Sequence, residues 1–543
     1  MKKGNQLDKA PKILVITGRA AEQIVRKYIP HNVEVKILSV DVAAFINKKL
    51  ILENLDKKTA QQYDIVMVPG LVQDDLSSLK DHFGVHVVKG PRYASDIKSA
   101  IQDVDPYTLS PKIAADKLLK KQKIAMTKEV LHKGFNDPID KSQTEYYIGF
   151  KHKFPIGINR PPTVMAEIVD ATHLPMEKVI ERAEYYLKYG ANILDIGAMA
   201  NVSDPNKVKK IITKLKSMQE KHEFAISIDT LNVEEIQAAI KSGVELILSV
   251  DHGNIDHLIN DIPKDVGVVF VPTNTLKGIL PKTTEKRIAS LLQLKKRLLD
   301  AGITKIAADP IIEMPIFPGF ANSLAHYIEY RKRDTITPMM TCVGNVTEFI
   351  AADPVGINAL FGCLAVELGI QLVLVTDVSV KCRGGIKEVV KGRDMAFVAK
   401  QKNAPPKGHG IDVLMAKSRI ANDLEIVDFE KVETIKLTGD DHLLYQLDYE
   451  PDPKGSFTIW VDYHKQKIYV THLNPESNKP DLLFISNKAR HIFEKIVELN
   501  LITKIDHAFY MGRELERAEV SLYLGKSYIQ NKQPFNEEKL NFD

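Results

Sequence analysis

FAISIDT, residues 224–230, is a short apolar run that ends in the polar side chain Asp229. Seven similar runs lie between residues 163 and 377, and most are separated by helical patterns such as IASLLQLKKRLLDAG at 288–302. Eight β-α units within about 230 residues predict a (β/α)8 TIM barrel. The eight runs are TVMAEIVD (163–170), ANILDIG (191–197), FAISIDT (224–230), ELILSVD (245–251), GVVFVPTN (267–274), TKIAADP (304–310), TPMMTCVGN (337–345) and QLVLVTD (371–377).

Each of these runs ends in a polar side chain. In a parallel barrel the ends share the C-terminal face, where the βα-loops build active sites. We expect about half of the polar ends to be helix caps or supporting residues. The others form an acceptor-rich site for a ligand with several N–H donors, or for a metal ion with Asp170 and Asp251 as candidate Mg²⁺ ligands. The polar ends are Asp170, Asp195, Asp229, Asp251, Asn274, Asp309, Asn345 and Asp377.

Two further domains are expected to flank the barrel, since 543 residues predict about two to four domains. Before it, KILVITG, VEVKILSV, YDIVMVPG and GVHVVKG alternate with helical stretches, which predicts a flavodoxin- or Rossmann-like α/β domain. GxGxxG and GxxxxGK[ST] are absent from the sequence, so docking or regulation is favoured over nucleotide binding. After it, FTIWVDY, KIYVTHL and a helical tail predict a small α+β domain. The expected boundaries are 1–125 and 161–403 for the first two domains, 433–543 for the third, and 126–160 and 404–432 for linkers.

The composition of the chain disfavours several classes of protein, among them nucleic-acid-binding, disulfide-rich and membrane-spanning proteins. The net charge of +4 is small for this length and does not indicate nucleic-acid binding. The three cysteines have no CxxC spacing, which fits a reducing cytoplasm and disfavours a zinc ribbon or disulfide framework. The polar start and the lack of an apolar run near 18 residues predict neither a signal peptide nor a membrane span.

Several of the predicted strands resemble the dihydropteroate synthase (pterin-binding) family. YGANILDIGA, around Asp195, resembles the family strand G-A-D-I-I-D-I-G, and AISIDT matches its I-S-I-D-T motif. AADPIIEM resembles its D-P-G-I-G segment. The resemblance implies that Asp229 and Asp309 hydrogen-bond the amino-pyrimidine edge of a pterin, whose adjacent N–H donors suit a carboxylate.

The sequence departs from the synthase at other places. Ser249 stands where the synthase has an Asn, and CVGNVTEF, with Asn345, replaces its G-x-S-R-K loop. LVTDV keeps Asp377 but lacks the Arg and His of the diphosphate-binding motif R-V-H-D. Lys381 and Arg383, just after the eighth strand, are the candidate replacement for that anion site, and an ordinary solvated loop is the alternative.

The altered seventh motif resembles a second branch of this fold. GNVTEF followed by GINALF is similar to the pattern of pterin-dependent methyltransferases that act with corrinoid proteins. This resemblance implies that Asn345 supports N5 of a methyl-pterin with help from Asn358. Glu167 also lies where that branch has an acidic residue.

The three-part arrangement resembles an archaeal group of dihydropteroate synthase-related proteins, down to HAFYMGRELERAE at 507–519. The resemblance implies folate- or tetrahydromethanopterin-type one-carbon metabolism, and a homodimer is plausible in this family. The preferred hypothesis is a synthase-like transferase that joins a pterin methyl-diphosphate to an arylamine, with Mg²⁺ as an expected cofactor. A corrinoid-linked methyltransferase and a non-catalytic pterin-binding scaffold remain open.

Residue roles follow from this hypothesis. Asp229, Asn345 and Asp170 are the expected catalytic residues. In the C-terminal motif we expect Glu514, Arg517 and Glu519 on the helix surface and His507 to be packed or capping. The expected substrate-binding residues are Asp195, Asp229, Ser249, Asp251, Asn274, Asp309, Asn345, Asn358, Asp377, Lys381 and Arg383.

Overall fold

The computed structural model describes residues 10–30, 33–140, 142, 144–417 and 451–532. The chain divides into two compact units, Met1–His132 with Gly408–Ile411, and Lys133–Lys407 with Asp412–Asp543. No helix within the described residues combines the length and the apolar composition that crossing a bilayer requires.

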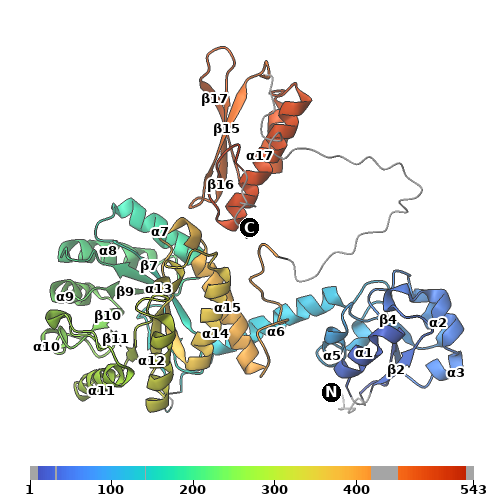
Figure 1. Ribbon diagram of the computed structural model, residues 1–543, viewed down its shortest axis with the longest axis horizontal. Coiled ribbons are helices and arrows are strands. Elements are labelled where there is room, and N and C mark those ends of the chain that lie inside the picture. Colours follow the sequence, from blue (N-terminus) through green and yellow to red (C-terminus); the bar gives the residue numbers. More distant parts are fainter. Residues whose placement is uncertain (1–9, 31–32, 141, 143, 418–450, 533–543) are drawn as a thin grey trace, which may run out of the picture. The chain divides into compact units, whose positions relative to one another are not determined.

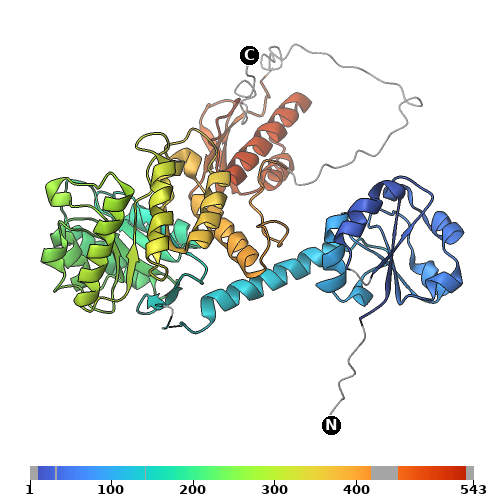
Figure 2. The ribbon, with the colours of Figure 1, turned by 60° about the horizontal axis from the view of Figure 1, so that its bottom comes forward.

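The first unit contains a four-stranded parallel sheet in the order β2-β1-β3-β4. Side chains alternate along its strands, so Leu14 and Ile16 pack on one face while Ile13 and Val15 pack on the other. Figure 2 shows the strands between helices on the two faces, which confirms the predicted α/β domain. The elements are β1 (Ile13–Thr17), β2 (Glu34–Ile37), β3 (Ile65–Val68), β4 (His86–Lys89), α1 (Glu22–Tyr28), α2 (Lys48–Asn54), α3 (Lys57–Ala60), α4 (Ser77–Phe83), α5 (Ile97–Gln102) and α6 (Asp116–Asn136).

The second unit contains a closed barrel of eight parallel strands in chain order, with helices around it (Figure 1). All eight predicted strands are present, so the predicted TIM barrel is confirmed. The strands are β7 (Thr163–Ile168), β8 (Ile193–Gly197), β9 (Ala225–Asp229), β10 (Leu246–Val250), β11 (Gly267–Phe270), β12 (Ile306–Ala308), β13 (Met339–Cys342) and β14 (Ile370–Val375). The helices are α7 (Met176–Lys188), α8 (Pro205–Met218), α9 (Val233–Ser242), α10 (Ile255–Leu258), α11 (Thr284–Asp300), α12 (Phe320–Arg333), α13 (Gly344–Thr347), α14 (Val355–Leu368) and α15 (Gly385–Gln401).

Local sequence sets the limits of the barrel helices. Asn232 caps α9 by accepting a hydrogen bond from the Glu235 N–H, and Gly243 ends the helix in the left-handed conformation at φ 79°. Asp204 caps α8 in the same way, with Pro205 in the first turn. These short, well-capped connections hold the strand ends in place beneath the loops.

Strand alternation separates two apolar layers of the barrel. On β8, Leu194 and Ile196 face the helices, whereas Ile193 belongs to the inner core together with Met165 and Ala225. The next inward position on β8, two residues after Ile193, is Asp195. The barrel interior is therefore apolar near its N-terminal end and becomes acidic toward the mouth.

A hairpin closes the N-terminal end of the barrel. It consists of β5 (Tyr146–Ile148) and β6 (Phe154–Ile156), whose Ile148 and Ile156 are buried in the inner core. The Tyr146 hydroxyl donates to the Ile306 carbonyl at 2.9 Å. Residues 126–160, expected to be a linker, thus contain this hairpin and the C-terminal part of the 21-residue α6.

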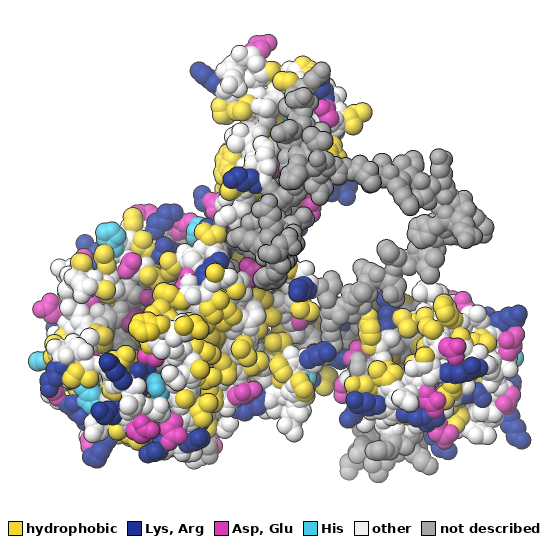
Figure 3. All heavy atoms as spheres, in the orientation of Figure 1, with side chains coloured by type: hydrophobic (Ala, Val, Ile, Leu, Met, Phe, Trp, Pro, Cys, Tyr) yellow, Lys and Arg dark blue, Asp and Glu magenta, His cyan; other side chains and the backbone are white. Residues whose placement is uncertain are grey.

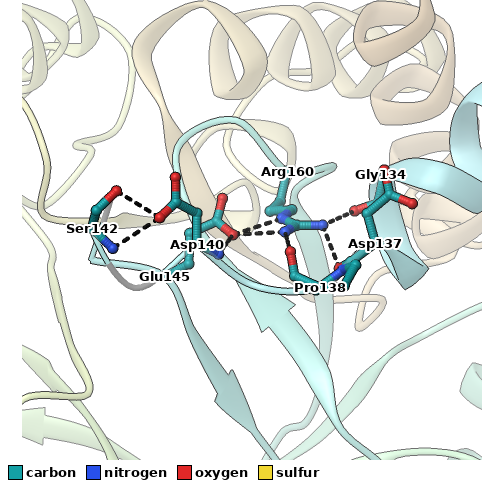
Figure 4. Close-up of polar contacts among 7 residues, drawn as sticks. All are labelled: Gly134, Asp137, Pro138, Asp140, Ser142, Glu145 and Arg160. Carbon is teal, nitrogen blue, oxygen red and sulfur yellow. Dashed lines mark hydrogen bonds and ion pairs between the residues drawn. The ribbon is translucent and has the colours of Figure 1, made fainter.

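One arginine joins the hairpin to the end of α6 (Figure 4). Arg160 is buried with Glu145, and its Nη2 lies 2.7 Å from Glu145 Oε2. Its remaining N–H groups donate to the carbonyls of Gly134, Asp137 and Pro138, at 2.5–3.2 Å. The guanidinium therefore caps carbonyls that the helix end leaves without partners.

The C-terminal region is an α+β domain, as predicted. Its antiparallel sheet has the order β15-β16-β17, and α16 and α17 share its apolar core. The predicted start at residue 433 lies outside the described residues. The third strand had not been predicted. The elements are β15 (Ser456–Asp462), β16 (Lys467–Leu473), β17 (Pro480–Ser486), α16 (Ala489–Glu498) and α17 (Ile505–Leu524).

The HAFYMGRELERAE motif corrects one expectation and supports another. Glu514, expected at the surface, is fully buried because it accepts hydrogen bonds from the Tyr528 hydroxyl and the Asn531 N–H, at 2.9 and 3.0 Å. The position of Glu514 within a helical pattern could not predict these hydrogen bonds, because both donors come from residues after the helix. His507 is buried against Asp452 near the start of α17, as a packed or capping histidine would be.

Candidate functional site

Three carboxyl groups on adjacent strands meet inside the mouth of the barrel. Glu167 on β7 pairs in register with Asp195 on β8, and Asp229 lies on β9. Their carboxylate oxygens lie within 4.8 Å of one another. Gly197 leaves the space for this arrangement, because a Cβ atom there would collide with the Glu167 carboxyl group.

A fourth carboxyl group, Asp309 after β12, faces the same space from across the barrel. It lies close enough to raise the pKa of Asp229. We call Glu167, Asp195, Asp229 and Asp309 the carboxyl cluster. Its members come from strands that are far apart in sequence, so the barrel brings together three predicted pterin contacts and Glu167.

Burial and mutual repulsion keep protons on this cluster. Burial, followed by the charges of Asp229 and Asp170, raises the pKa of Glu167 to about 8. Burial, followed by the charge of Asp309, raises the pKa of Asp229 to about 7. Burial, followed by the charges of Asp229 and Glu167, raises the pKa of Asp195 well above its ordinary value. At neutral pH the cluster therefore contains both proton donors and acceptors.

Asp195 is the deepest member of the cluster. It is fully buried, and its Oδ1 accepts a hydrogen bond from the Ser227 hydroxyl at 2.5 Å. Its Oδ2 is buried without a hydrogen-bond partner. Because an unpaired buried oxygen is costly, this atom is available to a neighbouring proton or ligand.

Asp309 is held by its own loop and by α12. Its Oδ1 accepts hydrogen bonds from the Tyr327 hydroxyl and the Ile311 N–H, both at 2.7 Å. Burial raises the pKa of Asp309 to about 6, and these two donors together with the charge of Arg287 oppose that rise. Arg287 itself is paired with Glu313 at 3.1 Å.

Two residues of the β13 segment complete the mouth. The Asn345 side chain donates to the Ile312 carbonyl at 2.9 Å, which fixes its amide and leaves its oxygen free to accept. Burial, followed by the charge of Glu167, raises the pKa of the Cys342 thiol well above its ordinary value. Cys342 is therefore a neutral thiol rather than a nucleophile.

Other predicted site residues serve their own loops. Asp251 is fully buried, and its two oxygens accept from the N–H groups of Gly253, Asn254 and Thr275 and from the Thr273 hydroxyl. Both oxygens are thus occupied by loop donors. Asn274 caps the short helix Thr275–Lys277. The structure also places Asp170 on the surface at φ 52° and Ser249 half-buried at the end of β10.

The residues after β14 form a separate group. Asp377 accepts from the Gly384 N–H at 3.1 Å, and burial raises the pKa of its carboxyl group to about 7. The Lys381 ammonium donates to the Ile350 carbonyl, and the Arg383 charge acts on Asp377.

Asn358 also lies outside the carboxyl cluster. It is buried on α14 and donates to Glu388 Oε2 at 2.8 Å.

Sequence reasoning missed three contributors to the site. Ser227 breaks the apolar run AISID at an inward position, so strand alternation could have found it. Strand alternation in β13 could likewise have predicted that Cys342 points inward. Tyr327, in contrast, lies within α12 and gives no signal, because only the folded barrel brings its hydroxyl to Asp309.

The oxygen atoms of this site could bind two kinds of ligand, a pterin or a divalent metal ion. The carboxyl cluster and the Asn345 oxygen are acceptors, which suits the N–H edge of a pterin. Glu167, Asp195 and Asp229 are also spaced closely enough to be ligands of a divalent ion when ionised. Asp170 and Asp251, the predicted Mg²⁺ ligands, are not part of this group.

Comparisons with known proteins show the family of the chain. A family model described as pterin binding enzyme matches residues 168–331. An uncharacterized protein of Methanocaldococcus jannaschii is 35% identical over 538 residues, which cover 96% of this chain and 98% of that protein. The chain belongs to the dihydropteroate synthase-related, pterin-binding family.

Further matches concern parts of this pterin-binding protein. A family of unknown function matches residues 11–92, and a family named PterinBD-DUF4346 matches residues 451–531. A dihydropteroate synthase of Streptococcus pyogenes is 24% identical over 168 residues, which cover 30% of this chain and 62% of the synthase. Among solved structures, the dihydropteroate synthase of Xanthomonas albilineans in complex with 7,8-dihydropteroate has 20% identity and a TM-score of 0.34, and covers 46% of this chain and 96% of that one.

Proposed function

We propose that this pterin-binding protein is a transferase that takes a one-carbon group from a ring nitrogen of a reduced pterin. One observation carries the proposal: the cluster that would receive the pterin combines ionisable acceptors with a carboxyl group, Glu167, that keeps its proton at neutral pH. Acceptors bind the pterin edge, and the proton suits a nitrogen leaving group.

Binding would be performed by Asp229 and Asp309. Each can accept from the 2-amino group or the adjacent ring N–H when it is ionised. Their pKa values, about 7 and about 6, allow ionisation near neutral pH once a donor-rich ligand replaces the solvent. Asn345, fixed by the Ile312 carbonyl, would orient the ring through its free oxygen.

Transfer would require one proton. The bond between the ring nitrogen and the one-carbon group breaks, the electron pair stays on nitrogen, and the nitrogen takes a proton from Glu167. The carbon forms its new bond with a nucleophile of the second substrate. A proton transfer of this kind contributes about 10²–10⁴-fold to a rate. The resemblance to corrinoid-dependent methyltransferases suggests a corrinoid protein as acceptor, and this partner and a cytoplasmic location stay predictions.

A synthase-like condensation is the second candidate, favoured by the similarity to named dihydropteroate synthases. It needs cations or Mg²⁺ to stabilise a leaving diphosphate. Lys381 and Arg383 are the residues that would supply this site. The Lys381 ammonium, however, already donates to the Ile350 carbonyl, which weighs against this role.

Calorimetry with two ligands separates these candidates. We expect a methyl-tetrahydropterin to bind without Mg²⁺, and Asp229→Asn or Asp309→Asn to weaken it by about 1–3 kcal/mol because a charged acceptor is lost. The exposed Asp300→Asn, at the end of α11, is the matched control and should bind like the wild type.

The outcomes against the proposal are distinct. Mg²⁺-dependent binding of a dihydropterin methyl-diphosphate, abolished by Lys381→Ala, would favour the synthase. Failure of every pterin to bind, or unchanged affinity in both cluster variants, would contradict pterin binding by this cluster.

A further inference from the structure

A cavity of about 250 Å³ lies among the helices outside the barrel strands, between α7 and the first turns of α15. These two helices are neighbours, because the strands that precede them, β7 and β14, pair in register. Residues 412–415 and the C-terminal domain supply the other walls, so every lining residue belongs to the second unit. The lining shares no residue with the carboxyl cluster, and the cavity is therefore a separate site.

Three cations line this cavity without a carboxylate bound to them. In the part of the chain that the structure describes, Arg383, Lys387 and Lys391 form no ion pair. The Nη1 atom of Arg383 is buried without a hydrogen-bond partner, which is costly unless a ligand accepts from it. Over the face of the barrel that Figure 3 shows, acidic and basic side chains are interspersed, so a group of cations without acidic partners is a departure from the rest of that surface.

The acidic residues of the cavity do not offset this charge. Glu388 is buried and accepts a hydrogen bond from Asn358 at 2.8 Å, and burial raises the pKa of its carboxyl group. Asp412 accepts from the Leu414 N–H at 3.3 Å. Even with both carboxyl groups ionised, three cations face two anions, so the cavity keeps a net positive charge.

Aromatic rings hold two of the cations in place. Arg383 Cζ lies 4.3 Å from the ring centroid of Tyr463, and Lys387 Nζ lies 5.9 Å from that of Tyr189. Tyr185 packs edge-on against Tyr189, with ring centroids 4.8 Å apart. A ring attracts a cation without neutralising its charge, so both cations remain available to an anion. The same rings give the cavity flat, apolar walls beside its charged groups.

We propose that this cavity binds a small phosphate monoester that carries a flat ring. The phosphate would accept hydrogen bonds from the buried N–H group of Arg383 and from the ammonium groups of Lys387 and Lys391. The ring would lie against Tyr185 and Tyr189. The volume equals that of about eight water molecules at about 30 Å³ each, which suits a compound of roughly ten non-hydrogen atoms.

Calorimetry on the full chain, with phenyl phosphate as the probe, tests the proposal. We expect phenyl phosphate to bind about five-fold or more tightly than inorganic phosphate, because its ring contacts the tyrosines. Phenol alone, which lacks the anion, should show no binding. A methyl-tetrahydropterin should not displace the probe, since the carboxyl cluster is a different site.

Variants of the cations locate the binding. Lys387→Ala and Lys391→Ala should each weaken the binding of phenyl phosphate about two- to five-fold, because each removes one solvent-accessible charge. Arg383→Met should weaken it about ten-fold or more, because a buried N–H donor to the anion is lost. Lys209→Ala removes an exposed lysine of α8 outside the cavity, and this matched control should bind like the wild type.

The outcomes against the proposal are concrete. No binding of phenyl phosphate at millimolar concentrations, or equal affinities for phenyl phosphate and inorganic phosphate, would overturn it. Displacement of the probe by the pterin, or unchanged affinity in both lysine variants, would do the same. Equal melting temperatures would show that the variants still fold, and the two lysine variants keep the test decisive if Arg383→Met is less stable.

Discussion

At the scale of single residues, the same sequence pattern has two outcomes. Asp251 and Asp229 both end apolar strands, and both appear equivalent in the sequence. The loop after β10 folds back and gives the oxygens of Asp251 several donors, whereas the structure shows no such donor for Asp229 among the described residues. Strand-end position could be predicted from the sequence, but the path of each loop could not.

Replacing Glu167 should change how stability depends on pH. The folded protein holds a proton on Glu167 up to pH about 8, while the unfolded chain releases it near 4.5. The unfolded state therefore binds fewer protons in this window, so stability must fall as pH rises from about 5 to about 8. A pKa difference of one unit corresponds to about 1.4 kcal/mol. Because the protons are shared among coupled carboxyl groups, we expect the free energy of unfolding to fall by an amount on the order of 2–4 kcal/mol over this window.

Chemical denaturation at pH 5, 6.5 and 8 measures this effect. Glu167→Gln should lose less stability over the window than the wild type, because an amide does not titrate, whereas the other carboxyl groups with raised pKa values still do. The exposed Glu177→Gln should behave like the wild type. An identical pH dependence in Glu167→Gln and wild type would show that Glu167 is ionised in the folded protein.

The Tyr327 hydroxyl should matter most at mildly acidic pH. It donates to Asp309 and holds the pKa of that carboxyl group lower than burial alone would set it. Tyr327→Phe should therefore raise the pKa of Asp309 above about 6 and weaken pterin binding about five- to ten-fold at pH 6.5, in line with the loss of one hydrogen bond of about 1 kcal/mol. The difference should shrink at pH 8.5, where Asp309 is ionised in both proteins. Equal losses of affinity at the two pH values in calorimetry would argue against this role.

At the scale of elements, the eight barrel strands were predictable because each is a short apolar run between amphipathic helices. The β5–β6 hairpin was missed, since its strands have three residues each and their partners lie elsewhere in the chain. Arg160 was missed for a related reason. Its carbonyl partners become available only when α6 ends beside the hairpin.

Arg160→Ala should strongly destabilise the second unit. It would leave Glu145 buried without its partner and free several carbonyls at the end of α6. Breaking one side of a buried ion pair costs about 3–5 kcal/mol. Urea denaturation should show this loss, whereas Arg490→Ala, which breaks the exposed pair with Glu494, should cost less than about 1 kcal/mol. A loss below 1 kcal/mol in Arg160→Ala would mean that solvent replaces the guanidinium.

At the scale of the whole molecule, the three-part organisation was visible in the sequence as changes of pattern. The acidic character of the barrel mouth was also visible, as were Asp195, Asp229 and Asp309 as its main residues. The separation of Asp377 from the carboxyl cluster was not visible, because the direction of a side chain at a strand end depends on the following turn. Asp377 turns toward Gly384 rather than into the cluster.

The hairpin at the base has a consequence for the order of events. Because Ile148 and Ile156 pack with the inner core at the N-terminal end, the described residues leave the carboxyl cluster accessible only from the mouth of the barrel. The pterin at Asp195 and Asp229 must therefore bind before the second substrate, and it must leave after the product formed from that second substrate. Steady-state kinetics should therefore show a compulsory order with the pterin first, and the spent pterin should compete only with its fresh counterpart. Random-order inhibition patterns would require a second route into the barrel.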